Sequence, residues 1–276
     1  MATGVGYRLY RLSLAELALW IVASLVLAFL VLPLLVIIPI SFSSGAFLTF
    51  PPPGFSLRWY QVLASEEPWR RAFQNSLIVG AVATTIATVL GTLAALGIAR
   101  LSFRGKSLLT AVLISPMIVP VIIVGTGVYF FFSPLGLTGS LLGLALAHAA
   151  LGAPFVLITV SASLAGLDER YLRAAASLGA DPATTFRRVT LPLITPGVVS
   201  GALFAFITSF DEVVIALFLT GPGERTLPRQ MFDGIRENIS PTILAAATVL
   251  IVLAVILLVT TELLRRRNLR LRGVIE

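Results

Sequence analysis

The chain contains no cysteine, and among its 276 residues there is one histidine, His148. Without cysteine, neither a disulfide framework nor a thiolate-bound metal can form. A single histidine also argues against a zinc or haem enzyme, because histidine is a common ligand of both. No metal site is expected, although the sequence leaves a carboxylate-bound metal open.

Charged residues are also scarce. They make up 12% of the chain, against about 25% in typical soluble domains, while hydrophobic residues make up 57% and the mean hydropathy is +0.98. So little polar material cannot cover a water-facing surface, which excludes a soluble globular domain. The chain is expected to be an integral membrane protein.

Two sequence motifs are missing. The chain has no Gly-x-x-x-x-Gly-Lys-Ser/Thr phosphate loop, so any ATP chemistry must belong to another protein. It also has no Gly-x-Ser-x-Gly nucleophile motif, which disfavours a membrane-embedded hydrolase. The chain itself is therefore expected to be neither an ATPase nor another enzyme.

The net charge of +7 and the pI near 10.7 come from basic residues scattered between apolar runs, apart from the cluster Arg265 to Arg267. That distribution is typical of membrane insertion and not of a nucleic-acid-binding stripe. We therefore expect no nucleic-acid partner.

Six apolar runs are long enough to cross the ~30 Å of hydrocarbon, which takes roughly 20 residues each. They predict an all-α, polytopic fold with an N-terminal segment at 1–16, a membrane domain at 17–264 and a basic tail at 265–276. The first run is longer than a secretory apolar region and no small-x-small site follows it, so it is expected to remain as a span. The six predicted spans are Leu17–Ile40, Ser76–Ala99, Leu108–Phe132, Ser140–Leu164, Thr195–Leu219 and Ile243–Leu264.

Lysine and arginine are unequally divided between the two sides of this arrangement. Because cytoplasmic connections carry the excess of positive charge, the division of fourteen against six out of 20 predicts that both termini are cytoplasmic. The fourteen are Arg8, Arg11, Arg100, Arg104, Lys106, Arg170, Arg173, Arg187, Arg188, Arg265, Arg266, Arg267, Arg270 and Arg272; the six are Arg58, Arg70, Arg71, Arg225, Arg229 and Arg236.

The longest interruption on the predicted cytoplasmic side is the loop 165–194, called the elbow loop below. Its alanine-rich stretch Leu172–Leu178 favours a helix, and Gly179 is placed to end it. Asp181 followed by Pro182 predicts the start of a second short helix, which Leu191-Pro192 is expected to end. Small alanines on the first helix would allow the groove of another protein to approach its backbone; a plain amphipathic connector is the alternative.

The elbow loop resembles the coupling ("EAA") loop of ABC-importer membrane subunits. The pattern of that loop is Glu-Ala-Ala, three residues, Gly, and about nine residues to a hydrophobic-x-Leu-Pro end. One position departs from it, because Arg173 stands where the family usually has glutamate. The positions that match are Ala174, Ala175, Gly179, Val189, Leu191 and Pro192.

The resemblance extends from about Leu48 onward and is to the polyamine (spermidine/putrescine) branch, in particular to the second of its two permeases. It is carried by "GFSLRWY", by "NSLIVGAVATTIATVLGTLAALGIAR" and by "SFDEVVIALFLTGPGERTLPRQMFDGIRENISPTILA". These stretches lie in the first outer loop, in the second span and near the end of the chain.

This resemblance implies a type I importer permease in a prokaryotic inner membrane, forming half of a pathway for a small organic solute. The partners it implies are a second permease, homologous and non-identical, two cytoplasmic ATPase subunits that use ATP and Mg, and an external solute-binding protein. A polyamine is the favoured solute, and an amino-acid-like or opine-like solute is the alternative. The residues expected to contact the ATPase are Arg173, Ala174, Ala175, Gly179, Asp181, Leu191 and Pro192.

Two adjacent acids, Asp211 and Glu212, lie inside the fifth predicted span. Intramembrane acids cost about 2.5–3.5 kcal/mol on insertion scales and usually face a cavity or a partner. One reading pairs one of the acids internally, for instance Asp211 with His148. The other places an acid on the solute path, together with Thr208 and His148, to attract a cation.

Both readings fit an importer permease, but an ion-coupled secondary transporter could use the same acids as its ion site. No inverted repeat is evident among the six spans, which disfavours that class. In either case the sequence does not say which acid faces the path. The outer loop from Gly221 to Pro241 carries six charged residues and could meet a soluble partner or form a solvated cap.

Overall fold

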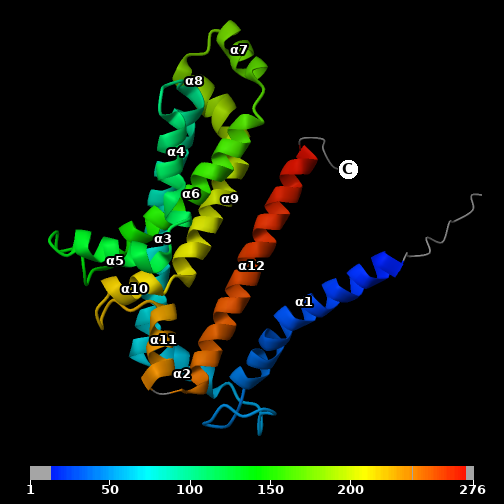
Figure 1. The fold of residues 1–276 in the computed structure, drawn as a ribbon, viewed down its shortest axis with the longest axis vertical. Helices are drawn as coiled ribbons and strands as arrows, with labels where there is room; N and C mark the ends of the chain where they lie inside the picture. Colours follow the sequence, from blue (N-terminus) through cyan, green and yellow to red (C-terminus); the bar gives the residue numbers. More distant parts are fainter. Residues whose placement is uncertain (1–13, 238, 272–276) are drawn as a thin grey trace, which may run out of the picture.

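The computed structural model describes residues 14–237 and 239–271 (Figure 1). Within these ranges the chain is helical, and its one β pairing is an isolated bridge between Ser43 and Phe55. The all-α prediction is confirmed. The helices are α1 Leu14–Ser41, α2 Arg58–Ser65, α3 Glu67–Arg100, α4 Lys106–Ile114, α5 Val121–Phe132, α6 Leu141–Ala165, α7 Glu169–Ser177, α8 Pro182–Thr185, α9 Leu191–Asp211, α10 Val214–Leu219, α11 Leu227–Glu237 and α12 Pro241–Leu271, with a 3₁₀ turn at Ser115–Met117 and a π turn at Phe186–Thr190.

Within the described residues, five helices are long and apolar enough to cross a membrane, and a bent pair can supply the sixth span. The bend corrects the prediction of a continuous span over Leu108–Phe132. α4 and α5 meet at 100° across the break that contains Pro116 and Pro120. Proline lacks the N–H that a helix interior needs and disfavours helical geometry in the preceding residue, so two prolines within five residues stop α4 and restart the chain in a new direction.

The core of the bundle is formed by α3, α6 and α9, which pack closely along their lengths. Glycines set the spacing: a Cβ on Gly91 of α3 would lie 2.7 Å from the Val156 Cβ, and a Cβ on Gly201 of α9 would lie 2.7 Å from the Val156 Cα. Small residues let membrane helices approach to backbone contact. Val156 of α6 is therefore enclosed from both sides and fully buried.

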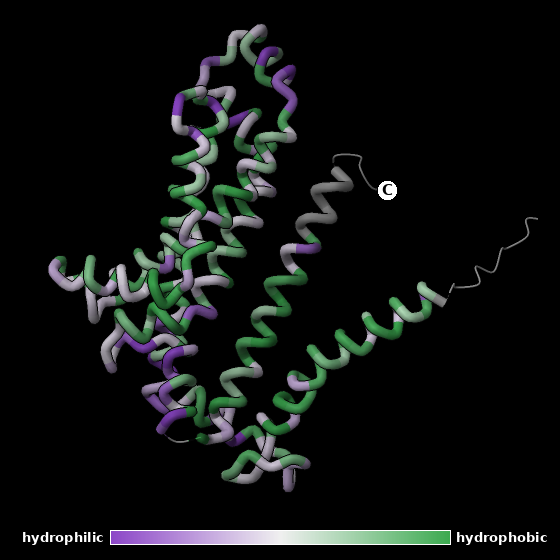
Figure 2. The backbone as a smooth tube through the Cα atoms, viewed as in Figure 1, coloured by the Kyte–Doolittle hydropathy of each residue, from purple (hydrophilic) through white to green (hydrophobic). Residues whose placement is uncertain are grey.

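The remaining long helices leave large apolar surfaces exposed. α1 packs against α12 near the α2 end of the molecule and leans away from the bundle, and it is hydrophobic along most of its length (Figures 1 and 2). Its side chains are largely exposed, including Phe29 at 79%. Such a continuous apolar surface is stable in hydrocarbon and not in water, as expected for a spanning helix.

The short helices gather at the two ends of the bundle. α7 and α8 lie together at one end, whereas α2 and α11 lie at the other (Figure 1). Purple hydrophilic segments are concentrated at both ends and green hydrophobic segments lie between them (Figure 2). Of the two predicted terminal segments, 1–13 and 272–276 lie outside the described residues; 14–16 begin α1, and 265–271 continue α12.

Candidate functional site

The fifth apolar run is broken at the two acids. The prediction of one continuous span over Thr195–Leu219 is wrong, because α9 ends at Asp211 and Glu212 takes an extended backbone with ψ of 123°. A separate six-residue helix, α10, begins at Val214. Thr208 and Glu212 therefore do not lie on one continuous helix.

The break is stabilised by the side chain of Glu212, which caps α10. Its Oε1 accepts hydrogen bonds from the N–H groups of Val214 (2.9 Å) and Ile215 (3.0 Å), and its Oε2 accepts from Ile215 (2.9 Å) and Ala216 (3.3 Å). The first N–H groups of a helix have no partner within it, and the helix dipole favours a negative charge there. The buried carboxylate thus accepts hydrogen bonds from N–H groups that have no partner within the helix, and the helix dipole stabilises its negative charge.

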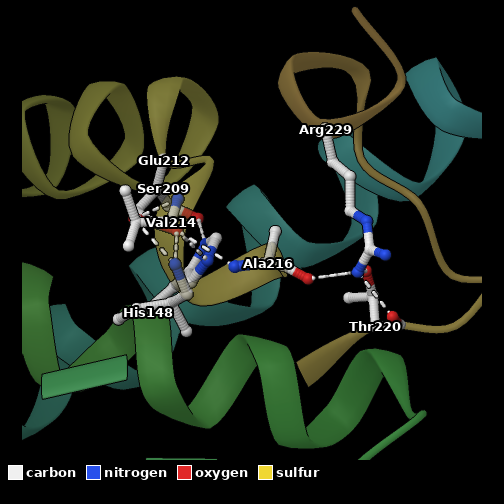
Figure 3. A network of polar contacts seen from close by, with 8 residues as sticks. His148, Ser209, Glu212, Val214, Ala216, Thr220 and Arg229 are labelled. Carbon is white, nitrogen blue, oxygen red and sulfur yellow. Dashed lines mark hydrogen bonds and ion pairs between the residues drawn. The ribbon is translucent and has the colours of Figure 1, made fainter. Parts of the chain in front are cut away.

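His148 of α6 lies behind this carboxylate and is fully buried. Its Nδ1 is 2.9 Å from the Ser209 Oγ, and its Nε2 is 3.5 Å from Glu212 Oε2 (Figure 3). Of the two acids, the histidine faces Glu212, so the suggested pairing with Asp211 is not the one formed. Ser209, Glu212 and His148 join α6 to the junction between α9 and α10.

The opposite end of α10 is held by Arg229 of α11 (Figure 3). One guanidinium nitrogen, Nη1, donates to the backbone oxygens of Ala216 (2.6 Å), Leu217 (3.3 Å) and Thr220, and to the Thr220 Oγ1 (2.7 Å). Cations are stabilised at the C-terminal end of a helix for the same reason that anions are stabilised at its start. α10 therefore has an acid at one end and a base at the other.

Beside this junction lies an open hollow of about 520 Å³. One edge of the hollow is formed by Thr208, Asp211 and Glu212, three of the four predicted path residues, and is called the acidic edge because it carries the two acids. The fourth, His148, lies behind Glu212 and does not line the hollow. The other walls come from the break in span three (Pro116, Met117, Val119, Val121), from α6 (Leu151, Phe155) and from Ile207 of α9.

The two acids differ in their surroundings. Asp211 is exposed and, within the described part of the chain, makes no hydrogen bond or ion pair. It also borders a second hollow of about 200 Å³ between α9 and α12, whose walls are otherwise apolar. Glu212 is buried, and its carboxylate oxygens already accept hydrogen bonds from backbone N–H groups. The geometry thus leaves Asp211 as the acid that is free to meet a ligand.

The elbow loop forms two short helices joined at Gly179, as predicted. α7 runs from Glu169 to Ser177, and the Gly179 backbone has a φ of +80°. The Asp181 side chain accepts a hydrogen bond from the Thr184 N–H at 2.8 Å and caps α8. Hydrogen bonding to Thr184 lowers the pKa of the Asp181 carboxyl, so this cap stays charged to a lower pH than an unbonded aspartate.

One detail of the elbow loop differs from the prediction. Leu191-Pro192 does not end the second helix, because the π turn Phe186–Thr190 leads from α8 directly into α9. In this turn the Leu191 N–H bonds to the Phe186 oxygen. Pro192 falls in the first turn of α9, where a missing N–H is tolerated. Residues Pro182–Asp211 therefore form one helical unit of 30 residues.

The predicted contact residues of the elbow loop are mostly on its surface. Arg173, Ala174, Gly179, Asp181, Leu191 and Pro192 are exposed, whereas Ala175 is buried at 9% exposure. Leu178, which was not among the predicted contacts, is 88% exposed. Leu178 lies next to the exposed Ala174 and Ala176 of α7, so this part of the elbow loop presents apolar side chains on its surface.

Because the elbow loop resembles the coupling loop of ABC-importer permeases, replacing Gly179 with valine is expected to reduce solute uptake per ATP hydrolysed. A β-branched residue at φ of +80° costs about 1–2 kcal/mol or more, and the α7–α8 angle must change to relieve it. Uptake and ATP hydrolysis measured together in vesicles will check this. Gly166 is the matched control, since its φ is −85° and the nearest atom to an added Cβ is 3.7 Å away; equal coupling in both variants would contradict a special role for the angle.

Two residues of this site were not identified from the sequence. Arg229 had been counted only as one of the six basic residues on the outer side, although Asp233 four residues later is the usual spacing of a helical ion pair. Ser209 is a lone hydroxyl in an apolar run and carries no motif. Their partners lie 61 positions away for Ser209 and 9 to 13 positions away for Arg229.

The fold and the elbow loop together define a helical membrane subunit of a transport system, and comparison with known proteins identifies its family. Residues 87–270 match the family described as "Binding-protein-dependent transport system inner membrane component", and the chain belongs to this family.

Two curated relatives come from Escherichia coli strain K12. The chain is 34% identical over 221 residues to the spermidine/putrescine transport system permease protein PotC, covering 80% of this chain and 83% of the relative. It is 35% identical over 238 residues to the putrescine transport system permease protein PotI, covering 83% and 84%. The family suggested by the EAA-like loop is thus confirmed.

Solved structures support the fold. A chain of a bacterial ABC transporter that imports the acidic polysaccharide alginate aligns with a TM-score of 0.67 at 17% identity, covering 92% of this chain and 95% of that one. A chain of an amino acid ABC transporter aligns with a TM-score of 0.57 over 76% and 98%. The chain therefore has the fold of an ABC-importer permease.

Proposed function

We propose that this permease forms half of the membrane pathway of an ATP-driven importer for a polyamine such as spermidine or putrescine. A homologous permease completes the pathway, an external binding protein delivers the solute, and two cytoplasmic ATPase subunits supply the energy from ATP and Mg. The observation that carries the proposal is the Asp211 carboxylate, which has no partner among the described residues and lies at the edge of a hollow in the span region.

Charge supports a cationic solute. An exposed carboxylate among apolar walls is costly unless a cation or water faces it. A polyamine offers ammonium groups separated by methylene chains, which suit a hollow whose acids are Asp211 and Glu212 and whose other walls include Val121, Leu151 and Phe155. The names of the relatives PotC and PotI agree with this class of solute.

The two acids then have separate roles. Asp211 meets the ammonium group, and Thr208, one helical turn before it on α9, adds a hydroxyl to the same wall. Glu212 stabilises the break that exposes Asp211, and His148 with Ser209 supports Glu212 from behind. In this arrangement the predicted path residues His148 and Glu212 act on the structure of the site, and not on the solute.

The elbow loop is the proposed contact with the ATPase. α7 and α8 lie at the end of the bundle opposite α2 and α11 (Figure 1), and the excess of basic residues predicts that the elbow-loop end is cytoplasmic. Ala174 presents an open backbone, and Arg173, exposed and without an ion-pair partner in the described chain, lies next to it. A groove that accepts α7 should therefore carry an acid near Arg173.

A single cysteine at position 174 should crosslink to the ATPase subunit. The natural chain has no cysteine, so Ala174→Cys gives a unique thiol in an unchanged background. The matched control is Ala175→Cys, whose side chain faces the interior of its own chain at 9% exposure. Crosslinking in inner-membrane vesicles, read by the mass of the product, checks this; a thiol at 174 that reacts only with lipid or free reagent would contradict the proposed contact.

A further inference from the structure

The link between α10 and α11 is the part of the site that the proposed function does not use. Arg229 makes four hydrogen bonds to the last turn of α10, all from Nη1. Its side chain is 15% exposed, so the guanidinium is largely withdrawn from water. A buried arginine needs a full set of acceptors, and here most of these are backbone oxygens of another helix.

Arg229 also lies close to an acid of its own helix, Asp233. Asp233 of α11 lies with its Oδ2 3.7 Å from the Arg229 Nε and 3.1 Å from the Arg225 Nε. The first turn of α11 is also joined to α3, because the Leu227 N–H donates to the Ser76 Oγ at 2.8 Å. Arg229 therefore extends from α11 to α10, whose Ile215, Ala216 and Leu219 are buried against α5 and α6.

At the other end of α10 lies the acidic edge of the hollow. Glu212 binds the first N–H groups of α10 and lines the hollow, and Asp211 is the adjacent residue in the chain. α10 has only six residues, about 9 Å at 1.5 Å per residue. In so short a helix, we expect a shift of the last turn to reach Glu212 and Asp211.

We propose that Arg229 is a positioning residue that ties α10 to α11, so that displacement of α11 is transmitted through α10 to the acidic edge of the hollow. The inference rests on the proposed function, which places α11 outside, where a binding protein docks. α11 is suited to such contact because Phe232 and Ile235 are exposed at 37% and 52%. Docking on α11 and the opening of the solute site become linked events.

Two measurements separate this role from a general loss of structure, and both compare Arg229→Gln with Arg236→Gln. Arg236 is an exposed arginine on the same helix and serves as the matched control. In hydrogen exchange on the purified chain, the amides of the last turn of α10 should exchange faster in Arg229→Gln only. This result depends on no partner and therefore tests the tie even if the proposed function is wrong.

In the complete transporter with its ATPase and a polyamine-loaded binding protein, Arg229→Gln should lower the maximal stimulated ATP hydrolysis by about fivefold or more, the scale of a typical coupling between two sites. Basal hydrolysis and the concentration of binding protein at half-stimulation should stay unchanged. If Arg229→Gln does not fold, Thr220→Val removes one hydroxyl acceptor with little change of shape and should give a smaller loss of the same kind.

Wild-type stimulation in Arg229→Gln, or an equal loss in Arg236→Gln, would overturn the proposal. Unchanged exchange of the α10 amides would overturn it as well. A wild-type complex that no polyamine-binding protein stimulates would instead count against the proposed function, and the exchange measurement would still decide whether Arg229 ties the two helices.

Discussion

Replacing Asp211 with asparagine should lower polyamine uptake by about tenfold to a hundredfold. The change removes the charge of Asp211, which lies at the edge of the hollow and makes no hydrogen bond or ion pair within the described part of the chain. Hydrogen bonds to charged groups contribute about 1.5–3 kcal/mol, where 1.4 kcal/mol corresponds to a factor of ten. Size is nearly conserved, so packing of α9 should not change. Uptake of labelled spermidine in cells that depend on this transporter measures the effect.

The conservative variant Asp211→Glu is the control, since it keeps the charge and should retain most of the uptake. ATPase assembly, measured by co-purification, should be equal in both variants because Asp211 lies far from the elbow loop along α9. Uptake at the wild-type rate in Asp211→Asn would remove the acid from the solute path. A loss of co-purified ATPase would show that the residue acts on assembly instead.

Replacing Glu212 with alanine should destabilise the protein by about 3–5 kcal/mol, the usual cost of removing one partner from a buried charged network. The N–H groups of Val214, Ile215 and Ala216 lose their acceptor, and His148 loses the carboxylate beside Nε2. A chain of this size should then melt on the order of 10 °C lower. Thermal unfolding in detergent micelles, with aggregation as the readout, measures the shift.

The variant Glu212→Gln separates the contribution of the negative charge from that of the capping hydrogen bonds. Glutamine keeps one oxygen acceptor for the backbone, so it should cost about 1–2 kcal/mol, less than alanine. Glu66→Ala is the matched control, because Glu66 is exposed and makes no capping hydrogen bond with its side chain. If Glu212→Ala melts with the wild type, the carboxylate does not stabilise the break, and the separate roles assigned to the two acids must be abandoned.

Much of the fold could be predicted because hydrocarbon imposes a simple rule on the chain: each crossing needs about 20 apolar residues. Four of the predicted spans correspond to continuous helices for this reason. The elbow loop was predicted in detail because Gly179, Asp181 and Pro182 each restrict the backbone locally, and local restrictions need no knowledge of the tertiary fold.

The two broken spans could not be predicted from hydropathy, since neither break interrupts the run of apolar residues for long. Prolines in membrane helices are often tolerated, so Pro116 and Pro120 did not by themselves indicate a 100° bend. The break at Glu212 depends on a side chain that folds back on its own backbone, and the opposing cap by Arg229 comes from a later helix. Such tertiary contacts carry no periodic signal.

The unbroken passage from α8 into α9 has a mechanical consequence. A 30-residue rod is about 45 Å long at 1.5 Å per residue, and Pro182 and Asp211 stand at its two tips. Tipping this rod by about 5° around one tip carries the other sideways by about 4 Å, more than the length of an ammonium–carboxylate contact. In the proposed importer, an ATPase subunit bound at the Pro182 end would therefore displace Asp211 directly, through this one helical unit.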